Sequence, residues 1–287
     1  MTDFITRFAP SPTGPLHLGH AYSALLAHDM ARAAGGTFLL RIEDIDRTRS
    51  RLHWEDQIYD DLAWLGISWD EKPMRQSDRL SEYKLALHDL WNRALLYPCF
   101  CTRRDISAAV SAPQEGAEPA FGPDGLIYSG TCREQYIRSS SFPKHDALRL
   151  DMQDALSAAD QPEFCYTEHS SGTDQTHCTP AKSMVHDVGD IVLSRRDFLG
   201  SYHLSVVLDD AAQGISHVVR GKDIQPATPI HVLLQKLLGL PTPTYHHHRL
   251  IRDENGKRLA KRDDARAIAT YRAEGKTPDD IRRMVGL

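Results

Sequence analysis

Two histidines near the start of the chain and a basic run near its end have the types and spacing needed to hold phosphate groups. His17 and His20 are separated by two residues, and positions 256–262 read GKRLAKR. Two imidazoles at the start of a helix can face one phosphate, because unpaired backbone N–H groups there already favour an anion. Lysines on a loop can then close over the remaining phosphates. The pairing predicts ATP chemistry, although the histidines alone would also fit a role in capping or covering a helix.

The two histidines belong to a longer string, RFAPSPTGPLHLGH at positions 7–20. RIEDIDRTR follows at 41–49, VVRGKD at 218–223, and then the basic run. In this order the segments resemble the class I aminoacyl-tRNA synthetases of the glutamyl and glutaminyl branch. The resemblance covers about residues 4–108 and 190–265, which is most of the chain.

Length separates the members of this branch. Conventional glutamyl-tRNA synthetases carry a further anticodon-binding region, and this sequence ends about 25 residues after the basic run. The most similar group is therefore the short glutamyl-queuosine tRNA(Asp) synthetases. The resemblance implies ATP-dependent activation of L-glutamate to glutamyl-adenylate and transfer of glutamate to the queuosine base in the anticodon loop of tRNA(Asp). A truncated conventional glutamyl-tRNA synthetase and a non-catalytic, synthetase-like binding module are the alternatives.

Composition bounds the class of protein. The 287 residues are 41% hydrophobic, enough to build the core of one large α/β domain or two modest ones. The first residues lack an apolar leader and no run reaches membrane-spanning length, so we expect a cytoplasmic protein. The net charge of −5 gives no support to RNA binding through diffuse charge, although arginines cluster at 47–51. No stable protein partner is implied.

Strand and helix patterns alternate in the first part of the chain. Residues 4–8 and 37–42 fit strands, residues 16–34 and 56–65 fit helices, and 11–15 fit a turn. Such alternation predicts a parallel sheet. The resemblance makes it the Rossmann-like sheet of a class I synthetase, with helices on both faces, an insertion subdomain and no anticodon-binding domain.

The periodicity along the rest of the chain predicts its division into parts. Apolar spacing predicts helices over 81–97 and 229–238, the second ended by Gly239, whereas residues near 111–125 and 160–182 fit loops. Four parts are expected, in this order: the first half of the catalytic domain (1–106), an insertion with a zinc site (107–190), the second half (191–240), and the lysine loop with a C-terminal helical segment (241–287).

Adenylation requires positive groups where charge collects on the phosphate oxygens as pyrophosphate leaves. The resemblance assigns His17 and His20 to the α-phosphate region and Lys261 to the pyrophosphate, and it implies Mg²⁺ bound with ATP. These three residues are the candidate catalytic and ATP-binding residues. Ala260 stands where the family commonly has a hydroxyl residue, so closure of the lysine loop is expected to be weaker or differently supported.

An amino-acid site for glutamate needs cations for two carboxylates and an acceptor for the ammonium group. By resemblance, Arg7 and Arg220 face the carboxylates, Glu43 receives the ammonium, and Tyr202 donates a hydroxyl. Ser11 lies in the same loop as part of this site. The acidic neighbours of Glu43, Asp44 and Asp46, could instead pair with Arg41 and Arg47.

Five cysteines, an odd number, argue against a disulfide framework and favour reduced thiols. The spacing of Cys99, Cys101, Tyr128 and Cys132 resembles the zinc site of the short queuosine enzymes, which implies one structural Zn²⁺. Chemistry alone, because zinc prefers sulfur and nitrogen, would nominate a different fourth ligand. The candidates are His145, Cys165, His169, His177 and Cys178.

Three consecutive histidines at 246–248 look like a metal site. Adjacent residues on a strand or loop point in different directions, however, so few metal sites are built in this way. We expect these imidazoles to be structural or to lie near ATP.

Overall fold

The computed structural model describes the chain apart from residues 1–2, 111–120, 136–140, 144, 171 and 253–265. Its strands are β1 (Ile5–Phe8), β2 (Thr37–Ile42), β3 (Met74–Arg75), β4 (Leu96–Cys99), β5 (Phe121–Gly122), β6 (Gly125–Leu126), β7 (Ala147–Leu150), β8 (Glu163–Ser170), β9 (Thr173–Pro180), β10 (Val192–Ser194), β11 (His217–Gly221) and β12 (Thr244–His248). Its α-helices are α1 (Leu18–Ala33), α2 (Leu52–Trp64), α3 (Leu80–Asn92), α4 (Arg103–Val110), α5 (Thr131–Gln135), α6 (Met152–Ala159), α7 (Ala181–Asp187), α8 (Tyr202–Ala212), α9 (Thr228–Leu238), α10 (Ile268–Ala273) and α11 (Pro278–Val285). Two short 3₁₀ helices are η1 (Gln76–Arg79) and η2 (Lys222–Ala227).

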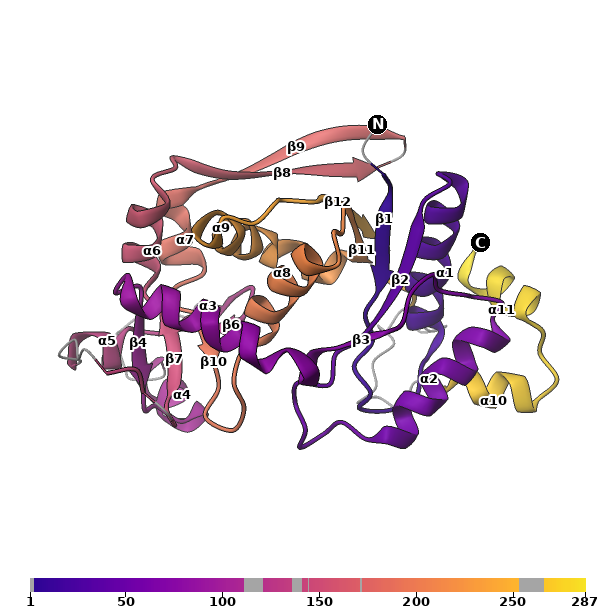
Figure 1. Cartoon of the computed structure of the whole chain (residues 1–287), viewed down its shortest axis with the longest axis horizontal. Coiled ribbons are helices and arrows are strands. Elements are labelled where there is room, and N and C mark those ends of the chain that lie inside the picture. The colour runs from indigo at the N-terminus through magenta and orange to yellow at the C-terminus, as the bar shows by residue number, and fades with distance from the viewer. Residues whose placement is uncertain (1–2, 111–120, 136–140, 144, 171, 253–265) are drawn as a thin grey trace.

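The main sheet is parallel over most of its width. β1 pairs with β2 and β2 with β3, while β11 pairs with β12 and β12 with β8, all in parallel. The two groups meet where the Ser216 backbone N–H donates to the Ile5 carbonyl at 3.0 Å, which places β1 beside β11 (Figure 1). Starting from β1, the strands β2 and β3 are added on one side, whereas starting from β11 the strands β12 and β8 are added on the other side. A switch point of this kind leaves a crevice at the carboxyl ends of the two strands.

Apolar side chains project from both faces of this sheet. On β2, Leu39 joins one buried cluster, while its neighbours Phe38 and Leu40 join a second. On β11, Val218 and Val219 divide between the two clusters in the same way. Because successive strand residues point to opposite faces, helices must cover both sides. The predicted fold, a parallel sheet with helices on both faces, is confirmed.

The helix predicted over 81–97 ends early. α3 stops at Asn92, Ala94 takes a positive φ of 57°, and the chain enters β4. β4 pairs antiparallel with β7, and β7 pairs antiparallel with β10, so Leu96 and Tyr97 belong to a small second sheet. The prediction was wrong here because an apolar helical stripe does not reveal pairing with a strand fifty residues away.

The stretch 160–182, predicted as a loop, forms the long β8–β9 hairpin that crosses the upper part of Figure 1. Phe164, Tyr166 and Glu168 are buried on one face of β8, and β8 pairs with β12 of the main sheet. The prediction failed because most exposed residues of β9 are Thr, Asp and Gln, which are also typical of loops.

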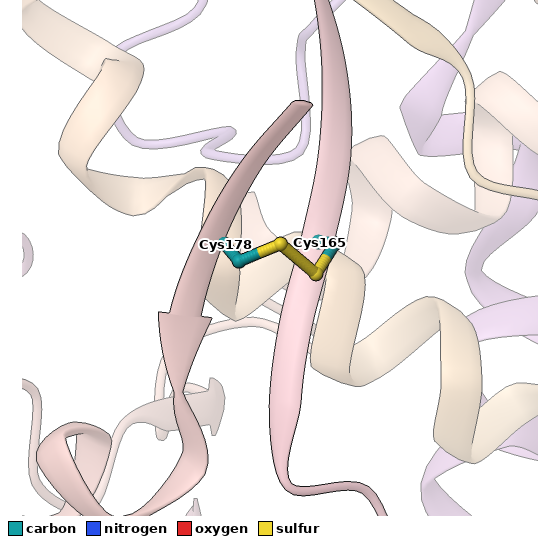
Figure 2. The surroundings of a disulfide bond; sticks show 2 residues. All are labelled: Cys165 and Cys178. Atoms are coloured by element: carbon teal, nitrogen blue, oxygen red, sulfur yellow. A yellow bond between two sulfur atoms is a disulfide. The ribbon is translucent and has the colours of Figure 1, made fainter. Parts of the chain in front are cut away.

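Figure 2 shows a disulfide between Cys165 and Cys178, which face each other across this hairpin. Their Cα atoms are 4.1 Å apart. The expectation of reduced thiols is therefore wrong for this pair. Directly opposite positions in an antiparallel register bring two side chains together, and the register could not be known while the segment was taken for a loop.

The C-terminal helices pack beside α1, at the far right of Figure 1. Arg282 of α11 forms an ion pair with Asp29 of α1, and the Ile268 backbone N–H donates to the Leu16 carbonyl at 2.8 Å. The segment that follows the basic run at 256–262 therefore starts next to the histidine motif, His17 and His20. Within the described part of the chain, no helix combines the length and the apolar character needed to span a membrane.

Candidate active site

A cavity of about 350 Å³ lies at the switch point of the sheet. The strands bring their carboxyl ends together there, so Arg7 at the end of β1, Glu43 just after β2 and Arg220 at the end of β11 become neighbours. The predicted substrate and phosphate residues that line this cavity are Arg7, Ser11, His20, Glu43, Tyr202 and Arg220. Residues up to 213 positions apart in the sequence are thus gathered around one space.

The wall at Arg7 contains a buried charge network that the sequence did not indicate. Asp210 of α8 accepts from Arg7 Nε at 2.8 Å and from Arg41 Nη1 at 2.7 Å. The charges of these two arginines outweigh the effect of burial and hold the pKa of Asp210 at about 2. Asp210 is therefore ionised and neutralises part of the Arg7 charge. The one signal in the sequence was the pair of carboxylates at 209–210 in an otherwise apolar helix.

Glu43, just after the neighbouring strand β2, lines the same cavity. Its carboxylate is 3.4 Å from Arg41 Nη2, and its backbone N–H donates to the Pro10 carbonyl at 3.0 Å. Burial raises the pKa of Glu43, more than Arg41 and Arg7 lower it. A cation arriving beside this carboxylate would therefore be well placed to keep it ionised.

The alternative partners considered for the arginines near Glu43 do not form. Asp44 accepts hydrogen bonds from Ser77, and Asp46 pairs with Arg49 at 2.7 Å. Glu43 is the acidic member of its segment that reaches the cavity next to Arg7 and Arg220.

Arg220 differs from Arg7 in the kind of partner it has. Its guanidinium donates to His247 Nε2 at 3.1 Å, to His231 Nδ1 at 3.0 Å and to Thr228 Oγ1 at 2.8 Å. Arg220 is only 7% exposed, yet none of the described residues gives it a carboxylate ion pair. A buried cation whose direct partners are neutral favours an anionic ligand, because no carboxylate among the described residues pairs with it.

The histidine motif forms the N-terminus of α1. His17 is the N-cap residue and its Nδ1 accepts from the Gly19 N–H at 3.1 Å, while His20 Nδ1 accepts from the His17 N–H at 3.2 Å. The two rings stack with centroids 3.7 Å apart. A Cβ on Gly19 would approach the His17 ring to 3.0 Å, so glycine keeps this cap intact. His20 therefore takes part in the cap of α1 and also lines the cavity.

Several predicted residues cannot be placed relative to this cavity. Lys261 and the rest of the basic run, including Ala260, lie outside the described residues. His17 is described, but the cavity lining includes its motif partner His20 and not His17 itself.

A second cavity of about 460 Å³ adjoins Tyr202 from the other side. Asp124, Arg195 and His203 contribute polar groups to it, and Cys99 and Cys101 lie at its wall. Tyr202, the first residue of α8, lines both cavities. The two spaces therefore share a boundary at one tyrosine.

The four predicted zinc ligands come together at the end of β4. The Cys101 and Cys132 sulfurs are 3.5 Å apart, and the Tyr128 hydroxyl lies 3.6 Å from Cys99 Sγ and 3.3 Å from Cys101 Sγ. A tetrahedral ion with Zn–S bonds of about 2.3 Å separates two ligand sulfurs by about 3.8 Å, so these spacings fit zinc. The three sulfurs all lie within 4.8 Å of one another.

The protein surroundings favour ligand chemistry at this cluster. Burial raises the pKa of the Cys132 thiol, but hydrogen bonds with Tyr128 and with the Phe100 backbone outweigh this effect and lower the pKa to about 7. The Arg149 guanidinium donates to Cys99 Sγ at 3.2 Å and stacks over the Tyr128 ring. A thiolate is the form of cysteine that binds zinc, so the donor set fits this metal.

The other residues considered as metal ligands lie elsewhere. Cys165 and Cys178 are bonded to each other, and His169 pairs with Asp174 on the same hairpin. The three consecutive histidines on β12 have separate partners: His246 bonds the His169 carbonyl, His247 bonds Glu168, and His248 bonds the Arg249 carbonyl. Alternation along a strand explains why they do not converge, as expected.

Comparison with known proteins agrees with this geometry. The sequence family described as tRNA synthetases class I (E and Q), catalytic domain, matches residues 3–287. A glutamyl-Q tRNA(Asp) synthetase of Rhodobacter capsulatus is 60% identical over 99% of this chain and 100% of its own length. One of Symbiobacterium thermophilum is 40% identical over 96% of this chain and 83% of its own.

Solved structures give the same answer for the fold. A glutamate tRNA ligase from Elizabethkingia meningosepticum, crystallised in complex with its amino acid, superposes with a TM-score of 0.76 at 27% identity. The match covers 99% of this chain and 60% of that protein, so this chain spans less than two thirds of the ligase. By its sequence and by its fold, the chain belongs to the class I tRNA synthetases, E and Q, catalytic-domain family.

Proposed function

We propose that this protein activates L-glutamate with ATP to glutamyl-adenylate and transfers the glutamyl group to the queuosine base of tRNA(Asp). The observation that carries the proposal is the charge arrangement of the 350 Å³ cavity. It combines a buried arginine, Arg220, which has no carboxylate partner among the described residues, with a carboxylate, Glu43, in the lining of the same cavity. An amino acid with an acidic side chain has the complementary charges.

In this assignment Arg220 and Arg7 receive substrate carboxylates and Glu43 receives the ammonium group. Arg220 is the stronger of the two anion sites, because Asp210 already neutralises part of Arg7. Tyr202 and Ser11 add hydroxyl groups at the wall. Glutamine should be rejected, because a neutral amide leaves the buried Arg220 charge without a counter-charge.

Adenylation then needs the glutamate carboxylate to attack the α-phosphorus of ATP. His20 lines the cavity at the N-terminus of α1, where the helix dipole also favours phosphate. We propose His17, His20 and Lys261 as the groups that stabilise charge on the phosphates. Mg²⁺ bound with ATP supplies further charge neutralisation. The protein needs no covalent nucleophile, because positioning and electrostatics suffice for this transfer.

Transfer requires the acceptor base to approach the activated carbonyl group. The 460 Å³ cavity beside Tyr202 offers a space for it, with Asp124 and Arg195 available for polar contacts. We propose that the acceptor enters there and that Tyr202 lies between it and the glutamate. The high identity to proteins named glutamyl-Q tRNA(Asp) synthetase supports queuosine as that acceptor.

We propose in addition that Cys99, Cys101, Tyr128 and Cys132 hold one structural zinc ion. Zinc there would tie the end of β4 to α5 through four protein ligands, the arrangement typical of structural sites. A cytoplasmic location, the absence of a stable protein partner and the division at residues 106, 190 and 240 remain proposals of the same kind.

Glutamate-dependent exchange of pyrophosphate into ATP, measured without RNA, tests the proposal. The short queuosine enzymes are expected to activate glutamate alone, whereas a truncated conventional glutamyl-tRNA synthetase is expected to need tRNA. Arg220→Ala and Glu43→Ala should raise the KM for glutamate far more than the KM for ATP. Arg93→Ala, which removes an exposed ion pair with Asp89 just after the end of α3, is the matched control. Equal effects on both substrates would remove these residues from the amino-acid site.

A further inference from the structure

We propose that His231 and His247 are positioning residues that fix the Arg220 guanidinium for a substrate carboxylate, each acting as a neutral hydrogen-bond acceptor. The inference rests on the proposed function, because it concerns the arginine assigned there to glutamate. It adds two residues, His231 and the middle histidine of the tract at 246–248, to which the proposed function gives no role. Both imidazoles are buried: His231 is 1% exposed, and the His247 side chain is 1% exposed.

The first arm runs from Arg220 to β8. Arg220 Nε donates to His247 Nε2 at 3.1 Å, and the other ring nitrogen, His247 Nδ1, lies 2.6 Å from Glu168 Oε2. The His247 backbone N–H donates to the second Glu168 oxygen at 2.7 Å. Because a carboxylate accepts, the ring proton is on Nδ1 and Nε2 is left as an acceptor. Glu168 thereby selects the tautomer that Arg220 needs.

The second arm runs from Arg220 through α9 to α8. Arg220 Nη1 donates to His231 Nδ1 at 3.0 Å, and His231 Nε2 lies 3.1 Å from His203 Nδ1. His203 Nε2 in turn lies 3.3 Å from Asp124 Oδ1. With Arg220 as a permanent donor, each imidazole in this series carries one proton, on Nε2, and passes a hydrogen bond to the next. Asp124 ends the series as the acceptor.

Buried surroundings keep both acceptors neutral. Burial first, and then the Arg220 charge, lower the pKa of His247 to about 4. The same two causes lower the pKa of His231 well below its ordinary value. A protonated imidazole would have no lone pair for Arg220 and would repel it, so neutrality is a condition of the arrangement.

Neutral acceptors do what a carboxylate could not do at this position. Asp210 orients Arg7 but also compensates its charge, whereas His231, His247 and Thr228 orient Arg220 and bring no charge of their own to it. These three bonds use one N–H on each of Nε, Nη1 and Nη2. A guanidinium has five N–H groups, so one remains on each terminal nitrogen for a ligand. The arginine is fixed in orientation and still able to bind an anion.

Paired substitutions distinguish orientation from packing. His231→Asn places an oxygen near the position of Nδ1, and His247→Gln places one near Nε2, so both keep an acceptor for Arg220. His231→Leu and His247→Leu fill a similar volume without an acceptor. His246→Leu is the control, because the neighbouring imidazole on β12 bonds the His169 carbonyl and not Arg220.

We expect each leucine variant to raise the KM for glutamate by roughly tenfold or more, since an unfixed or unpaired buried arginine costs more than about 1.4 kcal/mol. The KM for ATP should stay within about twofold, and the Asn and Gln variants should recover most of the loss. KM is the readout because a partly folded preparation lowers kcat but leaves KM unchanged.

A double-mutant cycle gives the second measurement. In an Arg220→Lys background the leucine substitutions should have little further effect on the KM for glutamate, because a lysine ammonium cannot make the same three bonds. If a leucine variant does not fold, Glu168→Gln is used instead. A glutamine amide can donate to His247 Nδ1 as well as accept from it, so it no longer fixes which ring nitrogen of His247 carries the proton. That variant should raise the KM for glutamate without Arg220 being changed.

Three results would overturn the inference. Leucine variants that raise both KM values equally, or that match the Asn and Gln variants, would make the histidines packing residues only. Leucine effects that persist unchanged in the Arg220→Lys background would show that they act independently of the arginine. Wild-type protein that exchanges no pyrophosphate with glutamate would instead contradict the proposed function, so the two failures are distinct.

Discussion

Arg7 and Asp210 form a two-bond ion pair on the wall of the candidate active site, with Nε–Oδ1 at 2.8 Å and Nη2–Oδ2 at 3.3 Å. The two residues are 203 positions apart, and the pair joins the end of β1 to α8. Arg41, which is fully buried, bonds the same carboxylate. One aspartate therefore compensates part of two buried positive charges, and the cavity next to it is left with Arg220 as its main anion site.

Asp210→Asn should destabilise the protein strongly. Removing the carboxylate leaves Arg7 and Arg41 buried with much less compensation, which typically costs about 3–5 kcal/mol of unfolding free energy. Urea unfolding of wild type and variant measures this difference. Asp29→Asn breaks a surface pair with Arg282 and should cost no more than about 1 kcal/mol. Similar losses in the two variants would mean that the buried network has no special role in stability.

His20→Ala should lower the rate of glutamate-dependent pyrophosphate exchange by roughly a hundredfold, because a phosphate-stabilising group acts chiefly in the transition state. Lys261→Ala should have a similar effect. An alanine substitution is harder to interpret at His17, because His17→Ala also removes the N-cap contact of α1 and costs about 1 kcal/mol of stability. His17→Asn keeps an N-cap acceptor and isolates the contribution of the imidazole. Wild-type exchange rates in His20→Ala and Lys261→Ala, at matched thermal stability, would exclude this role.

Stability should fall as the pH drops from 7 to 5. The folded protein keeps His247 neutral with a pKa of about 4, because burial and then Arg220 disfavour its charged form. Between the ordinary histidine pKa of about 6.5 and 4, the unfolded chain binds a proton that the folded chain does not. The stability contribution is therefore complete above about pH 6.5 and lost as the pH falls toward 4.

For His247 alone the loss between pH 7 and pH 5 is about 2 kcal/mol. Chemical unfolding at the two pH values measures it, and His247→Gln should remove this share of the pH dependence. An identical pH dependence in wild type and His247→Gln would mean that His247 titrates normally in the folded protein.

The zinc proposal predicts one metal ion per chain in protein purified under reducing, chelator-free conditions. Cys132→Ser should lose most of this metal, loosen the β4–α5 region and weaken RNA transfer before it affects glutamate activation. The cluster adjoins the second cavity, which explains why transfer should be the more sensitive step. A metal content near zero in wild type would mean that the cysteines are simply buried. Loss of exchange as severe as in His20→Ala would contradict a purely structural role.

The elements that depend on local sequence were predicted correctly. The first strand, α1, β2 and the α9 helix with its Gly239 cap follow the apolar periodicity and the helix-stop signal within two residues. The cluster of Cys99, Cys101, Tyr128 and Cys132, which the structure brings together, was predicted through its resemblance to the zinc site of the short queuosine enzymes, since chemistry alone favoured a fourth ligand other than tyrosine.

Long-range pairing accounts for what the sequence did not reveal. The β8–β9 hairpin was missed because the exposed residues of β9 resemble a loop and because β8 joins the main sheet through β12, about 75 residues away; the Cys165–Cys178 disulfide was missed with it. Asp210 was missed because a buried carboxylate is recognised by its arginines, which come from β1 and β2. The acceptor role of His247 depends on Glu168, a contact between distant strands.

The most direct test of the account is transfer of labelled glutamate onto purified tRNA(Asp) with and without the queuosine modification. The account predicts label on the modified tRNA only, in an amount that depends on ATP and is reduced in Arg220→Ala. The label should stay after removal of the tRNA 3′-terminal nucleotide, because the acceptor is a base in the anticodon loop. Equal labelling of unmodified tRNA, or labelling that is lost with the 3′ terminus, would identify a conventional glutamyl-tRNA synthetase activity and contradict the central claim.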